Sequence, residues 1–182
     1  EDFKTILLEI PNIKNAYQSI EKVINKTPVM TSSTLNNIFG NSLFLKCENF
    51  QKVGAFKYRG ASNAVSLLSQ EEASKGVATH SSGNHAAALA LAAKIRGIKS
   101  YIVMPENSPE IKKNAVAGYG AEIIFCESTL KAREEALNQV VERTGATFIH
   151  PYNNVNVIAG QGTCALEFLN EIPDLDYIFS PL

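Results

Sequence analysis

Short apolar segments alternate with helical segments along most of this chain, and this alternation restricts its fold more than any other feature. Strands are predicted over residues 76–80, 100–104, 121–126, 147–149 and 176–180. Helices are predicted between them, over residues 84–96, 109–117, 130–143 and 157–170. Such an alternation is typical of an open, twisted, mostly parallel sheet with helices on both faces. The sequence therefore predicts an α/β fold.

The N-terminal third departs from that regular alternation. Residues 12–25 place apolar side chains at helical spacing, and Thr27-Pro28 should stop that helix, because the residue before proline avoids the helical region. A short helix over residues 33–39, a strand over 42–47 and a helix over 57–68 follow. The chain thus reaches the alternating part through a helix that begins at a lysine.

Composition excludes several classes of protein. Forty-five per cent of the 182 residues are hydrophobic, and 17 basic against 18 acidic residues leave a net charge of -1, which predicts no nucleic-acid partner. The longest apolar stretch, residues 86–93, is far shorter than the roughly 20 residues that span a bilayer, and residues 1–4 lack a signal-peptide pattern. Three cysteines without metal-ligand spacing predict no disulfide framework and a cytoplasmic protein without a metal site.

Lys57 is the first candidate for chemistry. It lies in the segment Gly54-Ala55-Phe56-Lys57-Tyr58-Arg59-Gly60-Ala61, beside an aromatic ring and at a loop-to-helix junction. Desolvation at such a junction would lower the pKa of the amine and make it a nucleophile toward an aldehyde. The alternative is an ordinary solvated surface lysine.

The segment Ser81-Ser82-Gly83-Asn84-His85 is the second candidate. It joins a predicted strand to an alanine-rich helix, where unpaired N–H groups and the positive end of the helix dipole favour a carboxylate or phosphate. The alternative is a plain helix cap made by Ser82 or Asn84. Together, an amine and an anion cradle indicate pyridoxal-phosphate (PLP) chemistry on an amino acid.

Gly160-Gln161-Gly162-Thr163, predicted at a helix start, is a weaker candidate for ligand contact. It matches neither the phosphate-binding loop of nucleotide enzymes nor a dinucleotide-binding glycine pattern. Glycines that permit close helix packing are the favoured interpretation.

At these residues the chain resembles the fold-type II PLP enzymes of the serine/threonine dehydratase and serine racemase group. The matching segments recur in order over nearly the whole chain. They are residues 26–29, 48–52, 54–61, 80–85, 117–121 and 158–163.

The resemblance implies a role for each residue of the two candidate segments. Lys57 is similar to the lysine that forms a Schiff base with PLP and moves the substrate Cα proton on one face. Phe56 corresponds to the ring against the pyridine, and Asn84 to the amide that binds the cofactor's phenol oxygen. Ser82 corresponds to a second acid/base on the opposite face. Ser81, Ser82, Asn84 and His85 would hold the substrate carboxylate.

The resemblance also implies an architecture similar to the tryptophan synthase β-subunit fold, of which this chain carries about the first half. Residues 1–70 and 156–182 would form an incomplete large PLP-binding domain, and residues 75–155 a small domain. The phosphate-binding loop and the acidic residues of a divalent-cation (Mg²⁺) site would follow Leu182. The full-length protein is expected to be a homodimer.

The implied activity is dehydration of L-serine- or L-threonine-type β-hydroxy amino acids to a 2-oxo acid and ammonia, with serine racemisation as a second activity. Three alternatives stay open: racemisation as the main activity, a β-replacing enzyme such as cysteine synthase, and a non-enzymatic amino-acid-binding module. The sequence Lys57-Tyr58-Arg59 argues against the β-replacing group, which usually shows Lys-Asp-Arg.

Four positions depart from the family pattern. Ala55 stands where serine is frequent. Val53 and Ala87 stand where nucleotide-activated serine racemases carry polar residues, which argues against activation by ATP. Tyr152 replaces the asparagine of animal racemases, a change expected to alter substrate choice.

Overall fold

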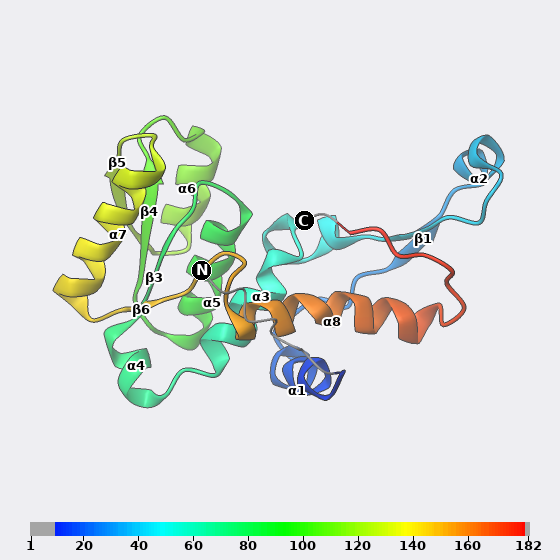
Figure 1. Cartoon of the computed structure of the whole chain (residues 1–182), viewed down its shortest axis with the longest axis horizontal. Coiled ribbons are helices and arrows are strands. Elements are labelled where there is room, and N and C mark those ends of the chain that lie inside the picture. The colour runs from blue at the N-terminus through cyan, green and yellow to red at the C-terminus, as the bar shows by residue number, and fades with distance from the viewer. Residues whose placement is uncertain (1–9, 181–182) are drawn as a thin grey trace.

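The computed structural model describes residues 10–180, with side chains from residue 12 onward. Two units lie side by side (Figure 1). The sheet unit, residues 77–148, contains a four-stranded sheet and its helices. The lysine-bearing unit, residues 10–66 and 155–171, contains three long helices and a two-stranded arm. The ends of the predicted large domain, residues 1–9 and 181–182, lie outside the described residues.

The sheet unit confirms the predicted parallel α/β architecture. All strand pairs in its sheet are parallel, in the order β5-β4-β3-β6. Helices α5 and α6 cover one face and α7 the other (Figure 1). The bounds are β3 Val77–His80, α5 Asn84–Arg96, β4 Ser100–Pro105, α6 Glu110–Gly118, β5 Glu122–Cys126, α7 Leu130–Thr144 and β6 Thr147–Phe148.

The two faces of β4 show why these residues form a central strand. All six of its residues are buried. Ile102 and Met104 belong to the core under α5, whereas Tyr101 and Val103 belong to the core under α7. Because side chains alternate along a strand, a continuous apolar run supplies both faces of a sheet that is covered twice.

The lysine-bearing unit packs α3 (Lys57–Ser66) between α8 (Val155–Glu171) and α5, with α1 (Ile10–Ile20) across α3 and α8. Its antiparallel strands β1 (Val29–Thr31) and β2 (Phe44–Lys46) carry the short helix α2 (Ser33–Phe39) at the far end of a projecting arm (Figure 1). Two 3₁₀ turns, η1 (Glu48–Phe50) and η2 (Lys52–Gly54), lead into α3.

Helices α3 and α8 meet at a pair of glycines. A Cβ atom on Gly160 would lie 2.6 Å from the Arg59 carbonyl oxygen and 2.6 Å from the Gly60 Cα atom. Gly160 was predicted at a helix start, but it lies inside α8. Its function is close packing, the interpretation that the sequence favoured.

Four local predictions were wrong or incomplete. Residues 176–180 form no strand, because no neighbouring strand pairs with them in the described chain. The first helix ends at Ile20 rather than at residue 25, where Gln51 binds the backbone of Asn25. Strand β1 and helix α4 (Gln70–Lys75) were not predicted.

None of the helices in residues 10–180 combines the length and apolar character needed to cross a membrane.

Candidate active site

The sheet topology places a switch point at the carboxyl ends of β3 and β6, and we call the region outside these strand ends the crevice. The chain passes from β3 to β4 to β5 in one direction and then returns to place β6 on the other side of β3. Ligands of open α/β sheets bind at such a switch point, outside the carboxyl ends of the strands. Residues 81–84 follow β3 there, and residues 149–153 follow β6.

Lys57 reaches this crevice from the lysine-bearing unit. It is the first residue of α3, and its Nζ atom donates a hydrogen bond of 3.1 Å to the Pro151 carbonyl oxygen. The same Nζ lies 5.4 Å from the centre of the Phe56 ring. Burial lowers the pKa of Lys57. A larger fraction of the amine is therefore neutral and able to attack an aldehyde.

The turn before Lys57 has unusual backbone geometry. Val53 has φ 58° and ψ 10°, and Gly54 follows with φ 70°. A β-branched residue at positive φ is strained, and such strain persists only where the surrounding structure fixes it. The lysine thus follows a turn that its surroundings must hold in place.

The N-terminus of α5 is open. No side chain caps it: Gly83 occupies the cap position, and Ser81 Oγ accepts a 3.2 Å hydrogen bond from the Gly83 N–H. The plain cap by Ser82 or Asn84 is therefore not observed. Ser82 is half-buried and Asn84 exposed, and the unpaired main-chain N–H groups of the first turn lie at this end of the helix.

His85 is more deeply buried than its predicted role suggests. Its side chain is 3% exposed, and Nε2 donates to the Ile149 carbonyl oxygen at 3.2 Å. Desolvation lowers the pKa of His85 to about 4, so the imidazole is neutral near pH 7. Nδ1 is buried without a hydrogen-bond partner among the described residues. His85 can contribute its main-chain N–H to an anion, while its side chain joins β6 to α5.

An aromatic cluster that the sequence did not predict lines the same end of the sheet. The His80 ring stacks on Phe148 at 5.8 Å, and the His150 ring contacts Tyr152 edge-on at 4.4 Å. His150 Nδ1 accepts hydrogen bonds from the N–H groups of Tyr152 and Asn153. The His80 and His150 rings lie 6.3 Å apart, and a sequence signal existed, since His80 ends β3 and His150 follows β6.

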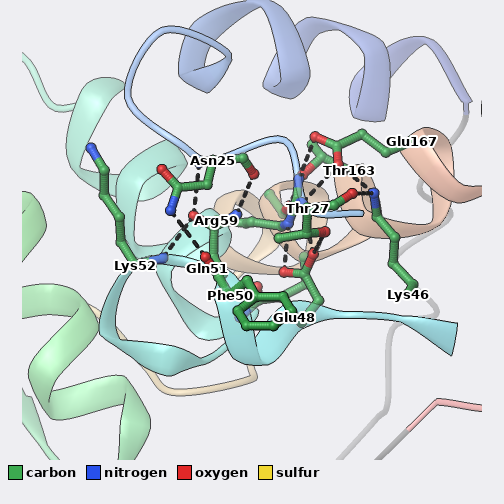
Figure 2. Close-up of polar contacts among 12 residues, drawn as sticks. Asn25, Thr27, Lys46, Glu48, Phe50, Gln51, Lys52, Arg59, Thr163 and Glu167 are labelled. Carbon is green, nitrogen blue, oxygen red and sulfur yellow. Dashed lines mark hydrogen bonds and ion pairs between the residues drawn. The ribbon is translucent and has the colours of Figure 1, made fainter. Parts of the chain in front are cut away.

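A buried ionic cluster was also missed (Figure 2). We define the Arg59 cluster as Lys46, Glu48, Arg59 and Glu167. Arg59 is 0% exposed and pairs with both carboxylates, and Lys46 pairs with Glu167 at 2.8 Å. Burial alone would lower the pKa of Arg59, but hydrogen bonds to Glu48 and Glu167 outweigh it and raise the pKa. Glu48 and Arg59 lie inside the segments that carry the family resemblance, which was the available signal.

The residues present fit PLP, as judged from the structure itself. A desolvated primary amine beside an aromatic ring suits an aldehyde on a flat heterocycle, and the open N-terminus of α5 suits a carboxylate. The unpartnered Nδ1 of His85 is a further buried polar atom close to the crevice. In residues 10–180, no group of three or more His, Cys, Asp or Glu side chains could hold a metal ion.

Comparison with known proteins agrees with this geometry. The family model described as pyridoxal-phosphate dependent enzyme matches residues 20–182. The chain is 50% identical over 182 residues to a serine racemase of Dictyostelium discoideum, covering 100% of this chain and 56% of that protein. It is 50% identical over 167 residues to a beta-hydroxyaspartate dehydratase of Paracoccus denitrificans, covering 92% and 53%.

A solved structure of maize serine racemase superimposes with a TM-score of 0.91 at 49% identity, covering 92% of this chain and 51% of that one. The chain therefore spans about half the length of the relatives that it matches.

Proposed function

This chain belongs to the family of pyridoxal-phosphate dependent enzymes, and from that premise we propose that it carries half of an active site that dehydrates small β-hydroxy amino acids. The observation that supports this most directly is the position of two segments at the switch point. The Lys57 amine binds the Pro151 carbonyl oxygen in the loop after β6, and the open N-terminus of α5 follows the neighbouring strand β3. We propose L-serine- and L-threonine-type substrates, with racemisation of serine as a second activity.

Each residue of the crevice then has a defined task. When bound, PLP supplies the electron sink that accepts the electron pair left by the departing Cα proton. The Lys57 amine, whose pKa is lowered by burial, takes that proton, and Phe56 offers a flat apolar face beside it. The substrate carboxylate binds N–H groups of the first turn of α5 and the side chains of Ser81 and Asn84. Loss of the Cα proton and of the β-hydroxyl as water, followed by hydrolysis, yields a 2-oxo acid and ammonia.

Racemisation shares the removal of the Cα proton but keeps the β-hydroxyl, and it ends with the return of a proton to Cα. If a hydroxyl returns a proton to Cα on the face opposite Lys57, the product is the D-amino acid instead of the 2-oxo acid. We assign that hydroxyl to Ser82, which is half-buried between β3 and α5. The serine racemases among the relatives support this second activity.

We also propose the domain organisation, location and oligomeric state of the whole protein. Residues 1–70 with 156–182 belong to a large domain, residues 75–155 form a small one, and the full-length protein is a cytoplasmic homodimer. All three cysteines are free, which suits a reducing compartment. Sedimentation velocity of the full-length protein tests the dimer.

The test of the function measures products. Full-length protein with PLP, Mg²⁺ and L-serine should give pyruvate, with D-serine in the same tube. The Ser82→Ala variant should lose D-serine by about 10²-fold while it keeps pyruvate within a few-fold, because only reprotonation needs that hydroxyl. Absence of both products with serine, threonine and 3-hydroxyaspartate would refute the proposal. Failure of borohydride to trap PLP on Lys57 would leave only an amino-acid-binding module.

A further inference from the structure

We propose that the Arg59 cluster is the positioning device that sets where the Lys57 amine lies in the crevice. This inference rests on the proposed function, because it assigns Lys57 the cofactor amine. Arg59 follows Lys57 by two residues in the first turn of α3 and touches no part of the crevice. It acts through Lys57 and is not itself catalytic.

Hydrogen bonds to three side chains fix the position of the Arg59 guanidinium. Its Nε and Nη2 atoms donate to the two oxygens of Glu48, both at 2.8 Å. Its Nη1 and Nη2 atoms donate to the two oxygens of Glu167, at 2.9 and 2.8 Å. Nη1 also donates to Thr163 Oγ1 at 3.3 Å. All five N–H donors of the guanidinium thus have acceptors. The two forked pairs, one with each carboxylate, fix the plane of the guanidinium.

The fork to Glu48 closes the loop that carries the lysine. Glu48 begins η1, the strained Val53 follows, and Arg59 ends the stretch just after Lys57. The strand before this loop is tied in as well, since Lys46 donates to Glu167 and to the Thr27 carbonyl oxygen. Thr27 Oγ1 in turn donates to Glu48 at 2.6 Å. A turn at positive φ persists only when its ends are fixed in this way.

Stability alone does not account for the cluster. A buried set of ion pairs is often no more stabilising than apolar side chains of similar volume, because desolvation offsets the attraction. What apolar side chains cannot reproduce is direction. Two forks oriented by one planar guanidinium join the η1 loop, α3 and α8, and Lys46 adds β2 through Glu167. We infer that the cluster fixes geometry, and the amine two residues away is the group whose geometry matters.

The experiment compares Arg59→Lys and Glu48→Gln with Leu137→Ala in the full-length protein. Arg59→Lys keeps the charge but loses both forks, and Glu48→Gln, a milder change, weakens one fork. Leu137 is buried under the sheet on α7 and lies outside the crevice, so Leu137→Ala lowers stability without touching Lys57. The first readout is the rate at which PLP becomes covalently attached to Lys57, followed by borohydride trapping.

We expect the attachment rate to fall about 10²-fold in Arg59→Lys and about 10-fold in Glu48→Gln, because a misplacement near 1 Å costs that much. With amino-acid substrate, kcat should fall while KM changes less than about threefold. Leu137→Ala should attach PLP at the rate of the unmodified protein after correction for the folded fraction. Unchanged attachment in both cluster variants, or an equal loss in Leu137→Ala, would overturn the proposal.

A second readout needs no PLP. Trace acetylation of the apoprotein over a pH series reports the pKa of Lys57, with the exposed Lys131 as an internal reference. The pKa of Lys57 should lie below the ordinary value for lysine in the unmodified protein and rise toward that value in Arg59→Lys, as the amine leaves its desolvated position. An unmoved pKa would contradict positioning. If the unmodified protein fails to bind PLP, the proposed function fails while this titration still decides the role of Arg59.

Discussion

The two units of the molecule bury different kinds of side chain. In the sheet unit the core is apolar on both faces of β4, and its buried polar side chains among the described residues are small hydroxyls and the neutral His85. The lysine-bearing unit buries Arg59, Glu167, Gln51 and Asn63 in its interior. The contrast separates two tasks: apolar burial holds a scaffold together, whereas oriented polar pairs set the position of one side chain.

The strongest test of this contrast removes the centre of the polar unit. Arg59→Met removes the ion-pair partner of the half-buried Glu48 and leaves the buried Glu167 with Lys46 alone, and we expect the free energy of unfolding to fall by about 4 kcal/mol. Denaturant titration of the full-length protein measures it. Adding Glu48→Leu and Glu167→Leu to Arg59→Met removes both carboxylates, but it also leaves Lys46 without its ion-pair partner Glu167. Adding Lys46→Met then replaces the whole cluster with apolar side chains. That fourfold variant should regain much of the stability, and no recovery would show that the ion pairs themselves stabilise the unit.

The matching change in the apolar unit is Leu137→Ala. Leu137 is 4% exposed and packs under the sheet from α7, so we expect a loss of about 3 kcal/mol from the lost burial and the cavity. Urea unfolding gives the value, and PLP attachment should be unaffected. A strong effect on attachment would mean that the two units share one mechanical role, and the contrast drawn above would fail.

The same contrast explains what could be predicted from the sequence. The sheet unit was predicted well because its signals are local: apolar runs, helical periodicity, and glycines such as Gly97 and Gly145 after helices. Of the two candidate segments, one follows β3, and the other carries Lys57, which binds the loop after the neighbouring strand β6. The Arg59 cluster joins residues 11 and 108 positions apart, and no periodicity connects Arg59 to Glu167.

Two further misses have related causes. The predicted strand over residues 176–180 lacked a partner, since a strand exists only through its neighbours. The family resemblance implies that His85 holds the substrate carboxylate, and the tertiary contact with Ile149 turns its imidazole inward, which leaves the main-chain N–H for that role. Local pattern indicates which segment lies at the site, and packing decides which atom of each residue faces it.

Acid should weaken the contact of α5 with the segment that follows β6, through His85. The pKa of this side chain is about 4 in the folded protein, lowered mainly by desolvation from the ordinary value of about 6.5. The unfolded chain therefore binds more protons between pH 6.5 and pH 4, so the stabilisation present above pH 6.5 is lost as pH falls through this window. From pH 7 to pH 5 the expected loss is about 2 kcal/mol.

Urea midpoints at the two pH values measure that loss. His85→Gln keeps a donor for the Ile149 carbonyl oxygen but cannot be protonated, so its stability should change much less between pH 7 and pH 5. His150→Gln is the matched control, because His150 is only half-buried. If the stability of His150→Gln changed equally little between pH 7 and pH 5, the acid sensitivity would belong to the aromatic cluster instead.

The smallest expected effect concerns helix α4, which connects the two units. Ser69 Oγ accepts from the Glu72 N–H at 3.2 Å, while a Glu72 carboxylate oxygen accepts from the Ser69 N–H at 2.7 Å. Ser69→Ala breaks this capping box and should cost about 1 kcal/mol. Helix α4 contacts β6 but none of the Arg59 cluster. If the units depend on different interactions, Ser69→Ala should lower the unfolding midpoint while PLP attachment to Lys57 keeps its rate. A slower attachment would mean that the connection between the units, and not the Arg59 cluster alone, determines where the lysine lies.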